Sequence, residues 1–563
     1  MSEQSTCDVL VVGGGPVGLT MACELRRHGL NPRIIDANAA PPIWSKAAGV
    51  AARTMEVWQD MGIVDRALKL GRPMYGANMY SGTERIAHLT FNITGTPFPY
   101  IFGLEQQRTE GMLAEHLRDL GGTFERPVKL IDFEQNDEGV TARLEYADGR
   151  EEKVRCRWLV GCDGAKSTVR HGLNLPFEGS TFEQTLMQAD VRVDLPFAVD
   201  PNEAVAFVSK DGVAGMLPLL EEGRYRFILL GVDNPPAVPP IELFQELVEQ
   251  RCPAGTRVYD PAWTISFRFH GRIVPRYRVG RVFLAGDAAH IHSPAGAQGM
   301  NLGIQDAYNL AWKLALVDKG VAKPTLLDSY DPERRPIGEG IVKGTDIFTQ
   351  RGMRFLTLRS PIAEALRNQA ISFVLNTGFV PQNFFQSLAQ IGVGYPNSPA
   401  VGEYHTPVWS TALGIRKDEG PRIGDWVRFA KGPGPGERVP DIELATGNTL
   451  FDVLRGTKHV LFLFDGSATT DAGYANLTSI ATQIEQRWGE HIVVHVVTPA
   501  AEKPAALQWS GSRLVDEDHR LHEHFGCNSE SLYLVRPDGY VGYRSQPADE
   551  GKLLHYLETI FAS

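Results

Sequence analysis

The stretch Asp8-Val9-Leu10-Val11-Val12-Gly13-Gly14-Gly15-Pro16-Val17-Gly18 decides the fold of this chain. Its mostly apolar first half predicts a buried strand, and a glycine-rich turn follows directly. Residues 19–28 then carry apolar side chains at helical spacing up to Gly29, and residues 33–36 predict a second strand. This order of strand, turn, helix and strand indicates the start of a doubly wound parallel α/β sheet.

The glycine loop has the spacing of a dinucleotide-binding turn, with Gly13, Gly15 and Gly18 at its key positions. In such a loop the first glycine makes the tight turn, the second lets the backbone reach a pyrophosphate, and the third allows close helix packing. Asp36 ends the next strand, where a carboxylate can accept hydrogen bonds from ribose hydroxyls. The loop therefore predicts a dinucleotide site rather than a merely structural turn, and it does not distinguish NAD from FAD.

Composition limits the classes of protein. The 563 residues, with 43% apolar and 22% charged side chains, are typical of a large multi-domain globular protein. The net charge is -11 and the basic residues are scattered, so nucleic acid is not expected as a partner. No apolar run approaches the roughly 20 residues of a membrane helix, and the polar first residues predict no signal peptide. The six cysteines form no C-x-x-C pair, which argues against a zinc or dithiol site and fits a cytoplasmic protein.

Strand patterns and turns divide the chain into three expected domains. Residues 181–275 alternate short apolar segments with Gly, Pro and Asp turns, which predicts an inserted, largely antiparallel sheet. The flanking residues 1–180 and 276–395 would form one discontinuous α/β domain that ends in helices. Near residue 400 the chain becomes rich in Pro and Gly, which predicts a boundary before a C-terminal domain over 400–563.

Two further strands break at a Gly-Asp pair or close to one. Residues 154–160 lead to Gly161-Cys162-Asp163-Gly164, and residues 281–285 lead to Gly286-Asp287-Ala288-Ala289-His290. A helix is expected to begin near Asn301, and its N–H groups and dipole would stabilise negative charge on a ligand. Taken by themselves, these residues are equally well interpreted as a loop before a capped helix.

Three motifs in this order carry a resemblance to the class A FAD-dependent aromatic hydroxylases: Gly13-x-Gly15-x-x-Gly18, Asp163-Gly164 and Gly286-Asp287-Ala288-Ala289-His290. The resemblance extends over about residues 7–345. It implies a Rossmann-like FAD-binding domain with an inserted antiparallel β-sheet that binds a phenolic or polyketide-derived aromatic substrate.

The C-terminal part resembles the thioredoxin-like domain that phenol and polyketide hydroxylases carry. Residues 436–441 and 534–541 bear this likeness, and Phe464-Asp465-Gly466-Ser467 stands where a redox thioredoxin has its cysteines. Because cysteines are missing there, the domain is expected to be structural or to form the contact of a homodimer.

The resemblance also implies which residues bind the cofactor. The glycine loop would hold the FAD pyrophosphate, Asp36 the ribose and Asp287 the ribityl chain, while Asp163 would serve both FAD and NAD(P)H. The loop and helix start at residues 299–302 would lie under the flavin ring, and Pro294 would line the place where substrate and flavin meet. The full set of expected cofactor contacts is Gly13, Gly15, Pro16, Val17, Gly18, Asp36, Lys46, Arg53, Gln106, Asp163, Gly286, Asp287, Pro294, Gly299, Met300, Asn301 and Leu302.

Two positions depart from the family pattern. Lys46 stands where many relatives have arginine, so a bidentate phosphate contact becomes a point charge and the affinity for pyridine nucleotide is in question. Ala48 offers no carboxylate where phenol 2-monooxygenases have an acidic residue. No catalytic base is therefore assigned. His290 and His292 lie in the flavin loop without evident partner ligands, so no metal is expected.

The resemblance implies a monooxygenase reaction. NAD(P)H would reduce FAD, O2 would add to the flavin, and the flavin hydroperoxide would transfer one oxygen atom to an electron-rich aromatic ring. Baeyer-Villiger insertion into a polycyclic ketone stays open as an alternative, and a non-oxygenase FAD oxidoreductase is a weaker one. No second G-x-G-x-x-G motif follows a strand, so NAD(P)H is expected to bind without a Rossmann domain of its own. The substrate, the choice between NADH and NADPH, and the oligomeric state are left open.

Overall fold

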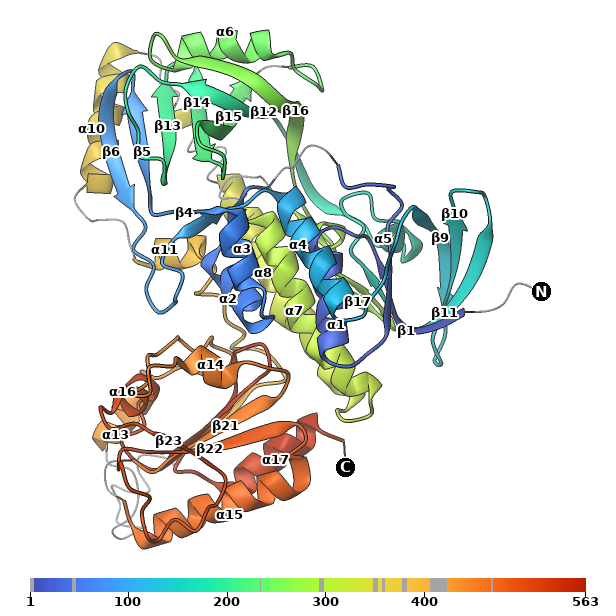
Figure 1. The fold of residues 1–563 in the computed structure, drawn as a ribbon, viewed down its shortest axis with the longest axis vertical. Helices are drawn as coiled ribbons and strands as arrows, with labels where there is room; N and C mark the ends of the chain where they lie inside the picture. The colour runs from blue at the N-terminus through green and yellow to red at the C-terminus, as the bar shows by residue number, and fades with distance from the viewer. Residues whose placement is uncertain are drawn as a thin grey trace. The chain divides into compact units, whose positions relative to one another are not determined.

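The computed structural model describes residues 5–42, 47–232, 234–292, 298–347, 353–356, 360–376, 382–405, 423–466 and 469–562 (Figure 1). The chain forms two compact units. The first unit comprises Met1–Ala311 and Arg334–Ile391, and the second comprises Trp312–Glu333 and Gly392–Ser563. The predicted boundaries of three domains stay predictions, because a compact unit need not coincide with a functional domain.

The first sheet carries the glycine loop at the carboxyl end of its central strand. Strand β1 (Ser5–Val12) lies between β11 (Glu151–Gly161) and β2 (Pro32–Ile35), and both pairs are parallel. The parallel run continues with β8 (Phe124–Glu125) beside β2 and with β18 (Val282–Leu284) beside β11. This order confirms the predicted Rossmann-like sheet. Antiparallel strands extend it: β9 (Val128–Gln135), β10 (Val140–Tyr146) and β17 (Arg278–Val279).

Burial explains why β1 forms at the centre of this sheet. Val9, Leu10 and Val11 are fully buried, as expected for a parallel strand that is covered on both faces. Helix α1 (Pro16–Arg27) begins directly after the loop, and Pro16 suits the first helical position because it needs no N–H partner there. Helix α1 packs against β2 and against α4 (Gln106–Asp119).

The second sheet of the first unit is built mainly from long antiparallel strands. Its order is β19-β16-β12-β15-β14-β13-β5-β6. The strands are β5 (Gly76–Ser81), β6 (Glu84–Thr90), β12 (Glu178–Asp194), β13 (Glu203–Ser209), β14 (Gly212–Pro218), β15 (Arg224–Val232), β16 (Arg257–Ile273) and β19 (His290–Ile291). The predicted segment 181–275 supplies the central strands, and β5 and β6 join them through a parallel pair between β5 and β13.

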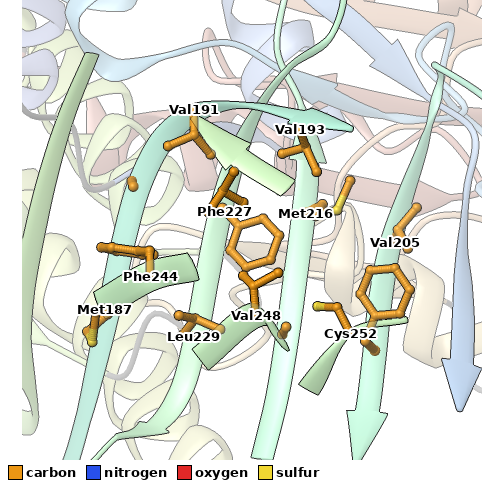
Figure 2. Close-up of a cluster of buried hydrophobic side chains, with 14 of the residues drawn as sticks. Met187, Val191, Val193, Val205, Met216, Phe227, Leu229, Phe244, Val248 and Cys252 are labelled. Carbon is orange, nitrogen blue, oxygen red and sulfur yellow. The ribbon is translucent and has the colours of Figure 1, made fainter. Parts of the chain in front are cut away.

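A hydrophobic core fills one face of this second sheet. Helix α6 (Ile241–Arg251) covers that face, and its Phe244 and Val248 belong to one core cluster with Met187, Phe227 and Leu229 of the strands (Figure 2). All five side chains are fully buried. Burying one such side chain contributes about 1.5–3 kcal/mol, so this core contributes strongly to the stability of the second sheet.

The first unit also contains a small sheet and further helices. A small sheet contains β3 (Gly49–Val50), β4 (Arg72–Met74) and β7 (Ile101–Gly103). Helices α7 (Gly299–Asp318) and α8 (Tyr330–Ile347) each run through residues of both units. The other helices are α2 (Ala52–Asp60), α3 (Val64–Leu70), α5 (Thr168–Gly172), the 3-10 turn η1 (Gly286–Ala288), α9 (Met353–Leu356), α10 (Pro361–Asn376) and α11 (Gln382–Leu388).

The second unit is a thioredoxin-like domain together with residues 312–333. Its sheet has the order β20 (Gly402–His405), β25 (Val541–Gln546), β24 (Ser531–Val535), β21 (His459–Phe464), β22 (Ile492–Thr498), β23 (Ser512–Val515). Strand β21 pairs parallel with β22 and antiparallel with β24. The helices are η2 (Pro324–Ser329), α13 (Ile423–Phe429), α14 (Leu450–Leu454), α15 (Asp471–Trp488), α16 (Arg520–Phe525) and α17 (Glu550–Ile560).

A buried charge network holds residues 312–333 to the rest of the second unit. The Glu333 carboxylate accepts hydrogen bonds from Lys313 Nζ at 2.6 Å, from Arg536 Nη1 at 2.7 Å and Nη2 at 2.9 Å, and from Ser398 Oγ at 2.5 Å. Arg536 also donates to Asp538. Burial lowers the pKa of Lys313 to about 8, although Glu333 acts in the opposite direction. Each charge here is therefore stable only while its partners are present.

No helix in the described part of the chain has both the length and the apolar character needed to span a lipid bilayer.

Replacing Glu333 with glutamine should strongly destabilise the second unit. The change keeps the shape but leaves the buried Lys313 ammonium without its carboxylate, which costs about 3–5 kcal/mol of unfolding free energy. Urea unfolding of the full chain measures this loss. The matched control is Glu339→Gln on the same helix, whose partner Lys343 is exposed, and it should cost less than about 1 kcal/mol. Equal losses in the two variants would contradict the role given to Glu333.

Candidate functional site

A cavity of about 310 Å³ opens at the carboxyl ends of β1, β2 and β11. The chain leaves β1 toward β2 on one side, while β11 lies on the other, so this is a topological switch point of the sheet. Ligands of open α/β sheets bind at such points. The cavity is lined by the glycine loop, the ends of β2 and β11 and one face of α4, and its polar and glycine residues are Gly13, Gly14, Gly15, Asp36, Asn38, Gln106, Glu110, Arg126, Lys129, Asp163, Gly164, Lys166 and Thr168.

The glycine loop packs tightly against protein at Gly13 and Gly18 and is open at Gly15. Gly13 has φ +108°, and a Cβ there would lie 2.3 Å from the Cys162 carbonyl oxygen. A Cβ on Gly18 would lie 1.9 Å from the Gly13 carbonyl oxygen, whereas Gly15 has nothing within 4 Å of that position. No side chain caps the start of α1 at Gly15, so first-turn N–H groups remain for an anion. The loop therefore fits a pyrophosphate group.

Asp36 is held at the mouth of the loop. Its Oδ2 accepts a hydrogen bond from the Gly14 N–H at 2.7 Å, and its Oδ1 accepts from the Asn38 N–H at 2.7 Å and Nδ2 at 3.0 Å. A carboxylate offers about four acceptor positions, so capacity remains for a ribose hydroxyl. Asp36 thus both fixes the loop and faces the cavity.

Helix α4 contributes two side chains, and only one of them was predicted. Gln106 lies at the start of α4, and its Nε2 donates a hydrogen bond to Glu110 Oε1 at 2.8 Å. Burial raises the pKa of Glu110. Arg126, Lys129 and Lys166 also line the cavity and were missed. Glu110 could have been found from its i+4 spacing to Gln106, but no sequence pattern marks the basic residues.

Asp163 lines the cavity while its carboxylate holds the start of α5. Oδ1 accepts a hydrogen bond from Ser167 Oγ at 2.5 Å, and Oδ2 accepts from the N–H groups of Thr168 at 2.6 Å and Val169 at 3.2 Å. Burial raises the pKa of Asp163, although these hydrogen bonds act against that effect. The structure therefore gives Asp163 a positioning task at the edge of the cavity.

Val17 connects the glycine loop to the second Gly-Asp motif. Gly286 has φ +60°, and a Cβ there would lie 2.8 Å from Val17 Cγ2. A Cβ on Gly303 of α7 would lie 2.5 Å from the same atom. Val17 thus packs between the turn η1 and helix α7, and the exposed Asp287 projects from that turn.

The start of α7 is tied to the strand β3 by Asn301. The side chain of Asn301 is buried, its Oδ1 accepts a hydrogen bond from the Ala51 N–H at 2.9 Å, and its Nδ2 donates to the Gly49 carbonyl at 2.9 Å. The predicted contacts Gly299, Met300 and Leu302 lie in the same first turns of α7. These positions can offer a cofactor backbone N–H groups, but the Asn301 side chain is already engaged.

Of the predicted contacts, Gly13, Gly15, Asp36, Gln106 and Asp163 line this cavity, and none of the others that the structure describes is part of its lining. Arg53 is buried on α2, where its Nη1 donates to Glu56 Oε2 at 2.8 Å, and it is absent from the cavity lining. Lys46 and Pro294 lie outside the described residues. Within the described ranges, no group of three His, Cys, Asp or Glu side chains could hold a metal ion.

The second unit has a buried ionic cluster where a redox thioredoxin carries its cysteines; Ser467 of that stretch lies outside the described residues. Asp465 directly follows β21, and its Oδ1 lies 3.2 Å from His522 Nε2. His522 Nδ1 lies 2.6 Å from Asp516 Oδ2, and the Tyr474 hydroxyl donates to Asp465 Oδ2 at 2.8 Å. Burial lowers the pKa of His522, but Asp465 and Asp516 outweigh it, so the pKa lies above its usual value. His522 therefore lies between two carboxylates that favour its protonated form.

Comparison with known proteins shows the family. Residues 6–345 match the model of the FAD binding domain, and residues 432–563 match the C-terminal domain of aromatic-ring hydroxylases. The chain is 32% identical to 6-methylpretetramide 4-monooxygenase of Streptomyces rimosus, over 98% of this chain and 93% of that protein. It is 31% identical to pentachlorophenol 4-monooxygenase of Sphingobium chlorophenolicum, over 98% and 96%. The solved structure of OxyS anhydrotetracycline hydroxylase from Streptomyces rimosus covers 99% of both chains, with a TM-score of 0.71 and 28% identity.

The chain belongs to the FAD-dependent aromatic-ring hydroxylases. It is an FAD-dependent monooxygenase of the aromatic hydroxylase type, and NAD(P)H is the co-substrate typical of this family. The predicted family and cofactors are confirmed. The relatives support hydroxylation and not the Baeyer-Villiger alternative.

Replacing Gly18 with alanine should abolish FAD binding. The new Cβ would lie 1.9 Å from the Gly13 carbonyl oxygen, and this oxygen belongs to backbone that cannot move aside without opening the loop. The flavin-to-protein ratio of the purified variant, read from its absorbance, measures the effect. Gly111→Ala on α4 is the matched control, because nothing lies within 4 Å of its Cβ, and it should keep full flavin content. A fully loaded Gly18→Ala protein would contradict the packing described.

Replacing His522 with glutamine should reduce stability at acidic to neutral pH more than at alkaline pH. Because the folded-state pKa of His522 is raised, its stabilising contribution is complete below the unfolded value of 6.5 and is lost as the pH rises through the folded pKa. Urea unfolding from pH 5 to about pH 9 should show the two proteins converging as the pH rises. The exposed His555→Gln serves as control and should show no such convergence. A difference that is constant with pH would rule out a charged His522.

Proposed function

We propose that this enzyme hydroxylates a phenolic or polyketide-derived aromatic ring. The observation that carries the proposal is the nucleotide-sized cavity at the switch point of the sheet, together with relatives named for oxygenation of pentachlorophenol and of 6-methylpretetramide. Both names denote aromatic ring substrates. The substrate of this chain is proposed to bind beside the second sheet, within residues 181–275.

We propose the following division of work among the cofactor contacts. Gly13, Gly15 and the start of α1 would hold the FAD pyrophosphate, Asp36 would accept the ribose hydroxyls, and Asp287 would contact the ribityl chain. This is supported by the open face at Gly15 and by the position of Asp36 at the cavity. The first turns of α7 would face the flavin ring. Pro16, Val17, Gln106, Asp163 and Gly286 support these contacts, and Lys46, Arg53 and Pro294 remain further proposed contacts.

When bound, FAD would supply the redox chemistry, which is acceptance of hydride from NAD(P)H and activation of oxygen for transfer to an aromatic ring. The protein's share of the reaction is binding and orientation. The N–H groups and dipole at the start of α7 would stabilise negative charge that develops in front of them. Asn301 fixes residues 49–51 beside that helix start, because it bonds to the backbone on both sides of Val50.

A buried arginine of the second sheet connects that sheet to the same region. Arg226 Nε and Nη2 donate to Asp190 Oδ1 and Oδ2 at 2.7 and 2.8 Å, and Arg226 Nη1 donates to the Ala47 carbonyl at 2.8 Å. Arg226 is fully buried. A substrate bound on the second sheet would therefore meet a backbone segment whose position is fixed by a charge-assisted contact.

The domain roles follow from this proposal. Residues 1–180 and 276–395 would bind FAD, residues 181–275 would shape the substrate site, and residues 400–563 would serve a structural role or form the contact of a homodimer. A cytoplasmic location is proposed because all six cysteines are free thiols.

The function is tested by anaerobic reduction of the flavoprotein with NADH and with NADPH, in the presence of a panel of phenols and polycyclic aromatics. Admission of O2 and mass analysis follow. We expect a substrate that accelerates flavin reduction and a product about 16 mass units heavier, with the new hydroxyl on the ring. An inactive, fully reduced non-aromatic analogue of the same size is the matched control. The proposal would be contradicted if no member of the panel gave an oxygenated product. A lactone product would instead support Baeyer-Villiger insertion.

A further inference from the structure

Asp306 joins two segments that are proposed to touch the cofactor. It lies in helix α7 and is 1% exposed. Its Oδ2 accepts hydrogen bonds from the Gly286 N–H at 3.0 Å and from His290 Nε2 at 2.8 Å, and its Oδ1 accepts from Arg334 Nε at 2.7 Å. One carboxylate therefore binds the turn η1, the first residue of strand β19 and helix α8.

The carboxylate of Asp306 is ionised in this environment. Burial raises its pKa, but Arg334 and His290 outweigh burial, and the pKa lies below the usual value. An ionised carboxylate only accepts hydrogen bonds, so His290 carries its proton on Nε2. Arg334 also donates from Nη2 to the Leu302 carbonyl at 3.1 Å, which lies in the first turns of α7. The start of the helix is thus held by the same network.

The network fixes the distance between the turn η1 and the N-terminal end of helix α7. Asp306 is seven residues beyond Gly299, which is about 10.5 Å along a helix. The Gly286 N–H bond to Asp306 therefore sets where the turn that bears Asp287 lies along α7. Val17 packs against both Gly286 and Gly303, and this contact fixes the spacing between the turn η1 and helix α7. Together these contacts set Asp287 relative to the start of α7.

We infer that Asp306 is a positioning residue that sets the Asp287 turn against the N-terminal end of helix α7, and so fixes the ribityl chain and the ring of FAD relative to each other. The inference rests on the proposed function, in which those two segments contact FAD. Asp306 itself is buried behind the turn, does not line the cavity and touches no reacting group.

Replacing Asp306 with asparagine tests this role with little change in size. Asparagine has one acceptor oxygen, so in either orientation its NH2 group faces an N–H donor, from Gly286 or from Arg334. We expect the Kd of FAD for the apoprotein to rise at least about tenfold, since a buried donor loses its partner. The reduction potential of the bound flavin should become more negative, because the helix start no longer faces the reduced ring at the same distance.

The control Glu24→Gln separates positioning from stability. Glu24 is a buried carboxylate of helix α1 that is paired with Arg27, so its loss should lower the thermal midpoint as Asp306→Asn does. We expect Glu24→Gln to keep the Kd of FAD within about twofold of that of the unaltered enzyme. Its flavin reduction potential should equal that of the unaltered enzyme within experimental error. If Asp306→Asn also keeps both while only its thermal midpoint falls, the positioning role is overturned.

A second variant covers the case in which Asp306→Asn does not fold. Arg334→Lys keeps the positive charge but cannot reach both Asp306 and the Leu302 carbonyl with a planar fork. It should raise the Kd of FAD several-fold and shift the potential in the same direction, and unchanged values would overturn the inference. If the unaltered protein fails to bind FAD, the proposed function falls, and this inference falls with it.

Discussion

Close contact between backbone segments at glycines is the constraint on which the first unit depends. Gly18 lies so near the Gly13 carbonyl that a Cβ would approach it to 1.9 Å. A Cβ on Gly303 would lie 2.5 Å from Val17 Cγ2 and 3.0 Å from Gly286 Cα. Any side chain at these positions would push the loop, the turn and helix α7 apart. The ends of three parallel strands can therefore converge on one cavity, and polar groups from distant parts of the sequence face the same small volume.

Local sequence patterns were sufficient to predict the parallel sheet, because an apolar run that ends in glycine indicates both a buried strand and the turn that follows it. They were not sufficient for residues whose position depends on tertiary packing. Arg126 reaches the cavity from the far end of the sheet, and no spacing links it to the glycine loop. A family motif records that Asn301 is present but not that its side chain bonds to the backbone near Val50. The parallel pairing of β5 with β13 joins segments too far apart in the chain for periodicity to reveal.

Buried polar side chains fix the position of the largely apolar helix α7 along and around its own axis. Polar side chains are buried at several points along it, and each has its own partner: Asn301 bonds to the β3 region, Asp306 to the turn η1, and Lys313 to Glu333. A hydrophobic stripe alone would tolerate a small slide or rotation, because apolar contacts are not directional. Buried hydrogen bonds do not tolerate it, since each displaced donor would lose its partner inside the protein.

The charge network of the second unit also has a consequence for how this chain could have been assembled from parts. Glu333 and Lys313 belong structurally with Arg536, yet in the gene they lie within the stretch that encodes the first unit. A recombination breakpoint near residue 400 would separate Glu333 from Arg536 and leave a buried charge without its partner. Exchange of the thioredoxin-like domain between relatives is therefore expected to succeed only where residues 312–333 are compatible with the incoming domain or travel with it. The part of the chain that must be exchanged together is therefore discontinuous in sequence, and the buried charge pairs define it.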